Sequence, residues 1–349
     1  MRTLPLCCGK NLTTAVQRAQ RYFLGIRMNI SSQLYSAARV AVRDCMGVKA
    51  GEKVLIVTDE PLRSIGYALW KEAKDIGAEV LLTEILPRKT NGEEPPREVA
   101  DLMKKVDVVL CPTSKSLTHT DARRNASGAG ARVATLPGVT EEIMIRCMNA
   151  DYNKIAARTF KLCAMLEKTN TIRVTAPGGT EISMPIKGRH AHASSGLFRE
   201  RGLWGNLPTG ESYLAPLEGE SNGVVVVDGS MASVGIIKEP IRIIVKDGFA
   251  TEITGADEAR RLRELLEPHG REAYTVAEFG IGTNDKAILT GNILEDEKVM
   301  GTIHIAFGDN KSMGGSVRVA SHLDGLIKGP TVWFDDKMIM RDGKFEIEE

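Results

Sequence analysis

The sequence predicts an α/β N-terminal domain with a parallel sheet, followed by a mostly β C-terminal domain. Three observations support this. The chain has 349 residues, more than twice a typical domain of about 150 residues, so two domains are expected. Apolar strand-like runs alternate with helical spacing from residue 51 to about residue 137. Beyond residue 170, hairpin signals replace that alternation, and the 34 glycines of the chain suit turn-rich β structure.

Composition narrows the function classes. The net charge is +1, and 42% of the residues are hydrophobic. A nucleic-acid-binding or membrane-surface protein would need a large basic excess, so neither partner is expected. No apolar run approaches the roughly 18 residues of a membrane span. The cysteines form no CxxC pair, and a chain of this size fits reduced thiols, which favours a cytoplasmic protein. The six are Cys7, Cys8, Cys45, Cys111, Cys147 and Cys163.

Residues 1–28 are expected to form a poorly structured extension. They contain five basic residues, and the first acidic residue of the chain is Asp44. A transit peptide could share this composition. We favour an extension from an upstream start codon, with the first domain covering residues 29–168.

The first domain alternates strands with helices. Strands are predicted over 51–59, 80–86, 107–114 and 131–138, and helices over 62–79, 96–106 and 140–168. Apolar strands separated by helices are typical of βαβ units in a parallel sheet that is covered on both faces. The first strand is followed by EPLRSIG, which is neither GxGxxG nor GxxxxGK[ST]. We therefore interpret this sheet as structural, not as a phosphate-binding site.

The second domain, residues 169–349, is predicted to be mostly β. Two hairpins are expected, one over 171–186 around Pro-Gly-Gly and one over 241–254 around Asp-Gly. A helix is predicted over 256–268, and the remainder reads as strand and turn.

Four of the six histidines give only weak indications of a metal-binding or catalytic role. We expect His119 and His269 to be solvated, the first in a polar loop and the second at a helix end. His190 and His192 lie in GRHAHASS, whose Gly- and Ser-rich flanks favour a loop without a ligand role.

The other two histidines indicate a metal site in the second domain. His304 lies in the strand-like GTIHIAFG, and His322 and Asp324 form SHLDG. Alternate strand residues point to one face, so an H-x-D pair places its two side chains about 7 Å apart on the same side. Glu278 stands among apolar residues in YTVAEFGIGTN, where an unpaired carboxylate would be costly. Glu211, in NLPTGES, is a fifth candidate ligand.

Two imidazoles and three carboxylates suit a hard or borderline divalent ion, and suffice for two ions that share a carboxylate. In chain order, the motifs NLPTGES, AEFGIGTN, GTIHIAFGDN and SHLDG resemble the metal-site motifs of the M29 family of metallo-aminopeptidases, the aminopeptidase T-like proteins. The resemblance implies a two-metal site with these five residues as ligands and Glu278 as the bridge. It also implies a homodimer.

One position departs from that family. The resemblance places a catalytic tyrosine seven residues after the HIA histidine, and this chain has Lys311 there. A related branch includes 2,5-dihydroxypyridine dioxygenase, in which one Fe(II) is held by two His and an Asp. His322 and Asp324 match two of these ligands, and the motifs assign no third.

Three functions follow. We expect a metal-dependent hydrolase of the aminopeptidase-like class that acts on a small molecule or short peptide. Zn, Co or Mn ions would activate water, Glu211 or a second carboxylate would relay the proton, and Lys311 would stabilise the oxyanion. The alternative is a mononuclear Fe(II) ring-cleaving dioxygenase. A non-catalytic metal-stabilised module is the third reading, which the carboxylate-rich ligand set disfavours because structural sites are usually thiolate-rich.

Overall fold

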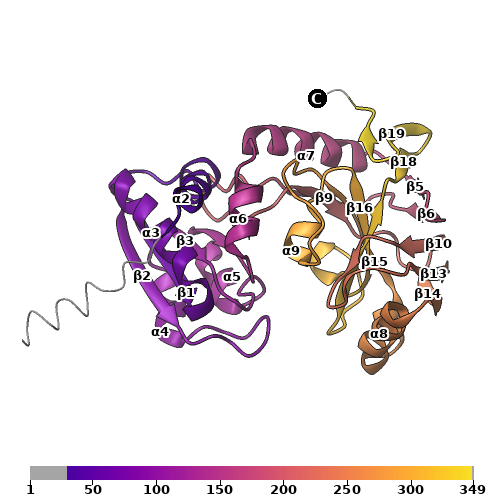
Figure 1. Ribbon diagram of the computed structural model, residues 1–349, viewed down its shortest axis with the longest axis horizontal. Helices are drawn as coiled ribbons and strands as arrows, with labels where there is room; N and C mark the ends of the chain where they lie inside the picture. The colour runs from indigo at the N-terminus through magenta and orange to yellow at the C-terminus, as the bar shows by residue number, and fades with distance from the viewer. Residues whose placement is uncertain (1–29, 348–349) are drawn as a thin grey trace, which may run out of the picture.

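The computed structural model describes residues 30–347, so the predicted extension over 1–28 lies outside the described residues. Figure 1 shows two lobes, with helix α7 (Tyr152–Leu166) running along the second of them. A parallel five-stranded sheet builds the first lobe, and sheets of eight and seven strands build the second. The predicted fold class is confirmed. The domain boundary near residue 168 stays a prediction. Among the described helices, none is long and apolar enough to cross a bilayer.

The first sheet has the strand order β2-β1-β3-β4-β8, and every neighbouring pair is parallel. Its strands are β1 (Lys53–Asp59), β2 (Glu79–Ile85), β3 (Val108–Cys111), β4 (Arg132–Thr135) and β8 (Trp204–Asn206). All residues of β3 and β4 are buried, as are all but the first of β1. This explains the continuous apolar runs in the sequence, because helices cover both faces of such a sheet.

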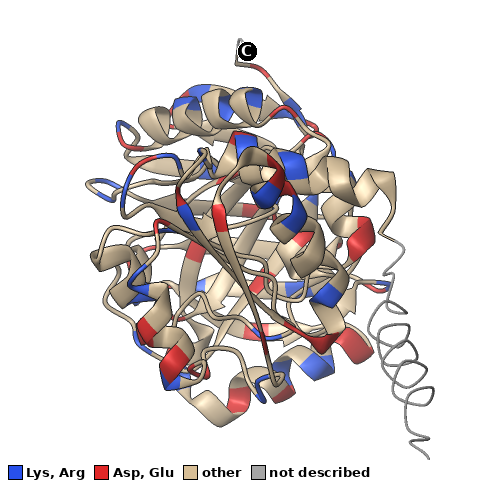
Figure 2. Cartoon of the chain, turned by 90° about the vertical axis from the view of Figure 1, so that its left-hand side faces the viewer, with Lys and Arg blue, Asp and Glu red and all other residues tan. Residues whose placement is uncertain are grey.

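The helices of this lobe include those predicted over 62–79 and 96–106, whereas the helical segment over 32–45 was not predicted. They are α2 (Ser32–Arg39), the π-helix η1 (Val40–Cys45), the 3-10 turn η2 (Glu60–Leu62), α3 (Arg63–Ile76), α4 (Arg97–Met103), α5 (Asp121–Gly128) and α6 (Glu141–Met148). The single helix predicted over 140–168 is instead two, α6 and α7. The break is explained by Asp151, whose side chain accepts the backbone N–H groups of Asn153 and Lys154 and so caps a new helix. Figure 2 shows basic and acidic residues interspersed over this lobe.

The eight-stranded sheet has the order β14-β13-β10-β6-β5-β18-β19-β20, and its pairs are antiparallel. Its strands are β5 (Thr171–Thr175), β6 (Glu181–Pro185), β10 (Asn222–Val227), β13 (Ile241–Lys246), β14 (Phe249–Thr254), β18 (Thr331–Phe334), β19 (Lys337–Arg341) and β20 (Lys344–Phe345). Helix α8 (Asp257–Leu266) contacts β13 and β14, and the 3-10 turns η3 (Glu267–His269) and η4 (Arg271–Tyr274) follow it.

The seven-stranded sheet has the order β12-β11-β17-β16-β15-β9-β7 and is also antiparallel. Its strands are β7 (His192–Ser194), β9 (Glu211–Leu214), β11 (Ser230–Met231), β12 (Gly235–Ile236), β15 (Val276–Gly282), β16 (Thr302–Gly308) and β17 (His322–Lys328). Two short helical segments connect its strands, α9 (Ile293–Asp296) and η5 (Lys311–Met313).

The two faces of the seven-stranded sheet have opposite character. Residues such as Phe279, Ile305 and Ile327 point to one side, where they join Ile172 and Val225 of the other sheet in one buried core. The alternate residues of β15, β16 and β17 carry the predicted metal ligands. Period-two alternation therefore sends the apolar half of each strand into the core and leaves the polar half for a site.

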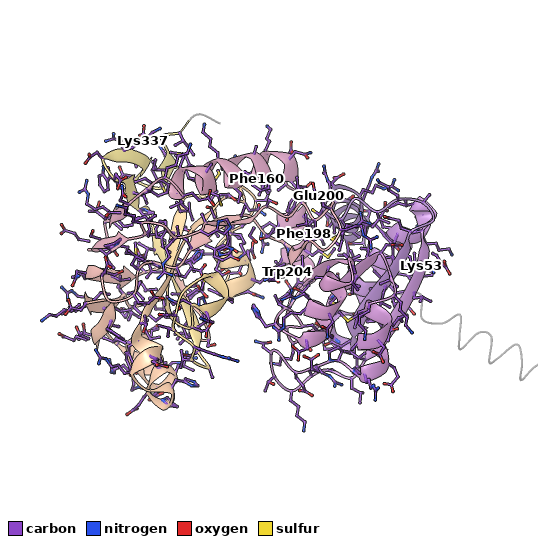
Figure 3. The ribbon with its side chains drawn as sticks, turned by 180° about the vertical axis from the view of Figure 1, so that it is seen from behind. Lys53, Phe160, Phe198, Glu200, Trp204 and Lys337 are labelled. Atoms are coloured by element: carbon purple, nitrogen blue, oxygen red, sulfur yellow. The ribbon has the colours of Figure 1, made fainter. Side chains whose placement is uncertain are left out.

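The chain passes between the lobes more than once. After β7 it returns to the first lobe, where the ring of Phe198 lies against Gly205 and Trp204 begins β8 (Figure 3). Polar contacts also join the lobes. Arg146 on α6 forms an ion pair with Glu295 on α9, at 2.7 Å between Nη2 and Oε2. These contacts fix the first lobe against the edge of the sheet that carries the site.

Candidate metal centre

The five sequence-predicted ligands come together on the polar face of the seven-stranded sheet. They lie on four strands: Glu211 begins β9, Glu278 is in β15, His304 is in β16, and His322 and Asp324 are in β17. The register explains their proximity, because Glu278 and Asp324 both pair with Ala306 from opposite sides. Because the Ala306 side chain is small, it does not fill the space between the two carboxylates.

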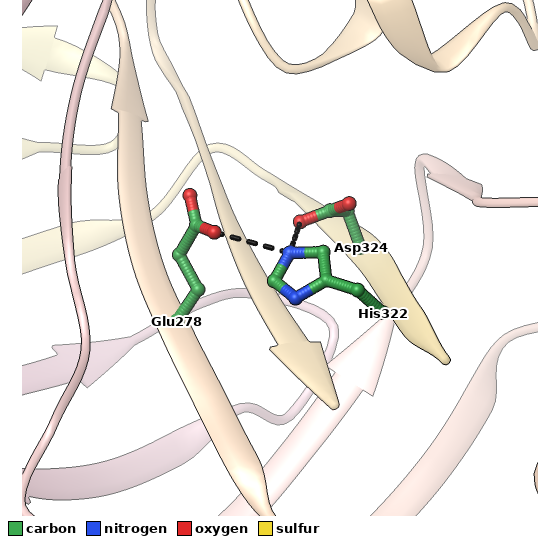
Figure 4. A group of neighbouring side chains, drawn as sticks. All are labelled: Glu278, His322 and Asp324. Atoms are coloured by element: carbon green, nitrogen blue, oxygen red, sulfur yellow. Dashed lines mark ion pairs between the residues drawn. The ribbon is translucent and has the colours of Figure 1, made fainter. Parts of the chain in front are cut away.

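Glu278, His322 and Asp324 form the tightest group (Figure 4). His322 Nε2 lies 3.1 Å from Glu278 Oε2 and 3.3 Å from Asp324 Oδ1. One ligand atom from each of the three lies within 4.8 Å of the others. Both carboxylates are buried and the imidazole is partly exposed, so the group has one open side.

The orientation of His322 suits a metal ligand. Its Nδ1 lies 2.7 Å from the backbone oxygen of Asp309. Since a carbonyl oxygen can only accept, Nδ1 carries a proton, and Nε2, which faces the two carboxylates, is the nitrogen available to a metal ion. A histidine that donates its second N–H to a carbonyl is the usual arrangement at metal sites. The residues therefore fit a divalent metal ion.

His304 is completely buried beside this group. Its Nε2 lies 3.2 Å from Glu278 Oε1 and 3.7 Å from Glu211 Oε2. Burial acts to lower the pKa of His304, but the hydrogen bond and charge of Glu278 and the charge of Glu211 outweigh it and raise the pKa to about 9. Glu278 thus contacts one imidazole through each of its two oxygens.

Two charged residues of the centre were not predicted from the sequence. Lys298 is buried, with its Nζ 2.7 Å from Glu211 Oε1, and it also forms an ion pair with Glu297. The side chain of Glu297 hydrogen-bonds to Asp324. Burial, together with the charges of Asp324 and Glu211, raises the pKa of Glu297 to about 8 even though Lys298 lowers it. The sequence LEDEKV reads as a solvated charge cluster, so it carried no signal of a buried site.

An aromatic pair borders the centre. The rings of His192 on β7 and Tyr213 on β9 are stacked, with centroids 5.2 Å apart and planes at 23°. The two residues pair across the strands, and Tyr213 in turn pairs with Gly280 in the row that contains His304. His192 Nε2 is buried and has no hydrogen-bond partner. The sequence predicted a loop here, but His192 belongs to a three-residue edge strand.

The remaining predicted residues lie further out. Lys311 is exposed at the start of η5, and its backbone N–H donates to Asp309. The described contacts of the metal centre do not include the Lys311 side chain. His119 is exposed in the loop before α5 of the first lobe. Partial desolvation of the imidazole and the charges of Arg123 and Arg124 lower its pKa, and its other charged neighbours are His322 and Asp309. His119 of the first lobe therefore lies near enough to His322 and Asp309 for its charge to interact with theirs.

Comparison with known proteins identifies the relatives of this chain. A family model described as 2,5-dihydroxypyridine 5,6-dioxygenase matches residues 33–347. A 2,5-dihydroxypyridine 5,6-dioxygenase from Pseudomonas putida is 24% identical over an alignment of 262 residues that covers 70% of this chain and 71% of the relative. The family model covers the second lobe, where the metal centre lies, and the stretch matched by the relative is too long to fit in the first lobe alone.

Two solved structures share the fold. The 2,5-dihydroxypyridine dioxygenase from Pseudomonas putida KT2440 has a TM-score of 0.79 at 19% identity, over 90% of this chain and 97% of that one. Wild-type AmpT from Thermus thermophilus has a TM-score of 0.67 at 18% identity, over 90% of this chain and 99% of that one. The resemblance to the aminopeptidase T-like proteins therefore holds for the fold.

The prediction of a metal-dependent hydrolase is wrong, and so are the aminopeptidase and metalloprotease activities attached to it. The matched family and the relative found by sequence are dioxygenases, which was the alternative function. The error has a physical cause. Both solved structures align over 90% of this chain, so motifs that place ligands on these strands report a shared scaffold and not the reaction carried out on it.

Proposed function

The chain belongs to the 2,5-dihydroxypyridine 5,6-dioxygenase family, and from this premise we propose that it cleaves a hydroxylated pyridine ring with dioxygen at the metal centre. The observation that carries the proposal is the family match over residues 33–347, which includes all the candidate ligands. The cluster of Glu278, His322 and Asp324 supports it, because three ligands on one side of an ion leave positions for a substrate and for O₂.

We propose that the metal is Fe(II), held by Glu278, His322 and Asp324. When bound, iron supplies the redox chemistry by which a ring and O₂ react, which amino-acid side chains alone do not provide. The chain's own groups fix the ligands. The Asp309 carbonyl holds the His322 ring through Nδ1, and His304 holds the Glu278 carboxylate through Nε2. Such outer contacts orient ligands and tune their basicity.

The stacked pair of His192 and Tyr213 is proposed to border the ring of the substrate. Both side chains are partly exposed and lie in the row next to Glu278. A planar aromatic substrate packs well against such rings. The unpartnered Nε2 of His192 offers a hydrogen bond to a polar group of the ring, and an unmet buried polar atom gains most from such a partner.

His119 is proposed to handle a proton on the opposite side. Its lowered pKa keeps the imidazole neutral near pH 7. A neutral imidazole near His322 can accept the proton of a ring hydroxyl. The loop that carries His119 belongs to the first lobe, so this role requires the observed packing of the two lobes.

An oxygen electrode tests the proposed function. The full-length protein is loaded anaerobically with Fe(II), and 2,5-dihydroxypyridine is then added in air-saturated buffer. We expect oxygen uptake with loss of the substrate's ring absorbance, and neither signal after loading with Zn²⁺. The Asp324→Asn variant should lose both signals, whereas Asp285→Asn, at a partly exposed carboxylate outside the cluster, should keep them. Folded, iron-loaded protein that consumes no oxygen would contradict the proposal.

We also propose that the chain forms a homodimer. Strand β2 is an edge strand of the first sheet, and Leu81 on it and Leu86 just after it are exposed. Exposed apolar side chains on an open strand edge favour association. Light scattering at micromolar concentration should give twice the monomer mass, and a monomer mass would contradict the dimer.

A further inference from the structure

A buried ammonium group stands among the carboxylates of the metal centre. Lys298 is 2% exposed. Its Nζ lies 2.7 Å from Glu211 Oε1, and it also forms an ion pair with Glu297. Through these partners it reaches both sides of the cluster, since Glu211 faces His304 at 3.7 Å and Glu297 hydrogen-bonds to Asp324.

The backbone holds Lys298 in this position. A Cβ on Gly282 would lie 2.2 Å from the carbonyl oxygen of Val299, so the segment that follows α9 lies directly on strand β15. The Lys298 carbonyl accepts the N–H of Asn284 at 2.9 Å. Gly282 pairs with Glu211 on the neighbouring strand. The backbone of Lys298 is therefore fixed against the strand that pairs with Glu211, within reach of the Glu211 carboxylate.

The five predicted ligands thus form two groups, one of three residues and one of two. Glu278, His322 and Asp324 form the tight group that fits one ion. Glu211 and His304 remain for a second ion, which would share Glu278 at about 3.5–4 Å from the first, as two-metal sites do. One oxygen of Glu211, however, is already bound to the ammonium of Lys298.

We propose that the Lys298 ammonium occupies the place of a second metal ion, so that the five-residue set holds one ion. A fixed positive charge beside Glu211 repels a second divalent ion and neutralises the carboxylates that would otherwise attract it. This inference rests on the proposed mononuclear dioxygenase site and names the residue that determines its metal number.

Metal counting tests the inference without turnover. The full-length protein is stripped with a chelator, saturated with redox-inert Zn²⁺, desalted and analysed by elemental mass spectrometry. We expect one equivalent of Zn²⁺ per chain for the wild type and two for Lys298→Met, which removes the charge and keeps the length. Lys298→Arg, which keeps the charge, should bind one. Lys286→Met, at an exposed lysine after β15, should also bind one.

A double variant checks that the second ion takes the predicted ligand. Lys298→Met/Glu211→Gln should return to one equivalent, because the carboxylate freed by the first change is lost by the second. Two equivalents in the wild type, or one in a folded Lys298→Met variant, would overturn the inference. If Lys298→Met fails to fold, electron paramagnetic resonance of the Mn²⁺-loaded wild type tests the same inference. A spectrum of two spin-coupled Mn²⁺ ions would overturn it, and a spectrum of uncoupled Mn²⁺ would support it.

Different results would contradict the proposed dioxygenase function and the proposed role of Lys298. If the wild type binds one Zn²⁺ per chain but the iron-loaded protein takes up no oxygen, the proposed dioxygenase function is contradicted. The proposal that Lys298 limits the number of bound metal ions then still stands. Oxygen uptake by a protein that binds two ions keeps the function and removes the role of Lys298.

Discussion

Gly280 and His304 pair across strands β15 and β16 so closely that a Cβ on Gly280 would lie 2.0 Å from Nε2 of the imidazole. The ring of His304 therefore covers the glycine, and this position lets Nε2 reach Glu278 on the same strand as Gly280, at 3.2 Å. A residue without a side chain is thus part of the support of the metal centre.

Gly280→Ala should displace His304 and loosen the centre. Overpacking of a buried site costs about 1–3 kcal/mol of stability, and misplaced outer contacts cost about 10–100-fold in metal affinity. Isothermal titration with Zn²⁺ and thermal unfolding measure the two effects. Gly128→Ala on α5, where an added Cβ meets no atom within 4 Å, is the matched control and should keep the metal affinity without loss of stability, since alanine is the better helix former. Unaltered metal affinity in Gly280→Ala would show that His304 does not position Glu278.

His192→Phe tests the proposed edge of the substrate site. Phenylalanine keeps a ring that can stack on Tyr213. It removes Nε2, which has no partner in the protein, and the hydrogen bond between the imidazole and the Met313 backbone. Loss of a buried hydrogen bond to substrate should raise KM about 10-fold, consistent with about 1–2 kcal/mol. The iron content should stay at the wild-type value, because His192 is outside the ligand group. A KM equal to that of the wild type would remove His192 from the substrate site.

The sequence identified the candidate ligands that the structure brings together, but not the charged residues that surround them. His304 and Glu278 were identifiable because an ionisable residue inside an apolar alternating strand needs a partner, and the H-x-D spacing placed His322 and Asp324 on one face. Lys298 could not be found in this way. It follows a short helix in a run of charges, and such a run normally faces water.

Strand register was the other missing information. Glu278 and Asp324 flank Ala306 only because β15, β16 and β17 pair in one particular register, and periodicity alone does not set the pairing of strands that are far apart in sequence. The same holds for β8, which joins the first sheet from a segment after residue 200. The reaction was not encoded in the motifs at all, since a shared scaffold presents the same residue types for different chemistry.

Acid should destabilise the protein in part through Glu218. Burial acts to raise the pKa of this carboxyl, but the Ser316 N–H at 2.7 Å, the Asn310 amide at 2.8 Å and the charge of Arg189 outweigh it and lower the pKa to about 2. A carboxyl with a lower pKa in the folded state stabilises the fold above its unfolded pKa, and this contribution is lost as the pH falls from about 4.5 towards 2.

Glu218→Gln should therefore lower the free energy of unfolding by about 2 kcal/mol at pH 6 and flatten its decline between pH 5 and pH 3. Urea unfolding at several pH values measures both. Glu264→Gln, at an exposed carboxylate on α8, should keep the wild-type slope. A Glu218→Gln variant with that same slope would mean that other carboxyls cause the acid sensitivity.

Arg146→Met should weaken the contact between the two lobes and lower the free energy of unfolding. The guanidinium donates two hydrogen bonds of 2.7 Å to Glu295, whose side chain is fully buried. Removal of one partner leaves a buried carboxylate that keeps only the Ile288 N–H, the Cys147 thiol and the Thr290 hydroxyl, and an uncompensated buried charge costs about 3–5 kcal/mol. Denaturant unfolding should show this loss, while Arg124→Met, at an exposed ion pair on α5, should cost less than about 1 kcal/mol. Helix α9 leads directly into Glu297 and Lys298, so Arg146→Met should also weaken Zn²⁺ binding. A variant that loses stability but keeps the full Zn²⁺ affinity would show that the contact between the lobes does not support the metal centre.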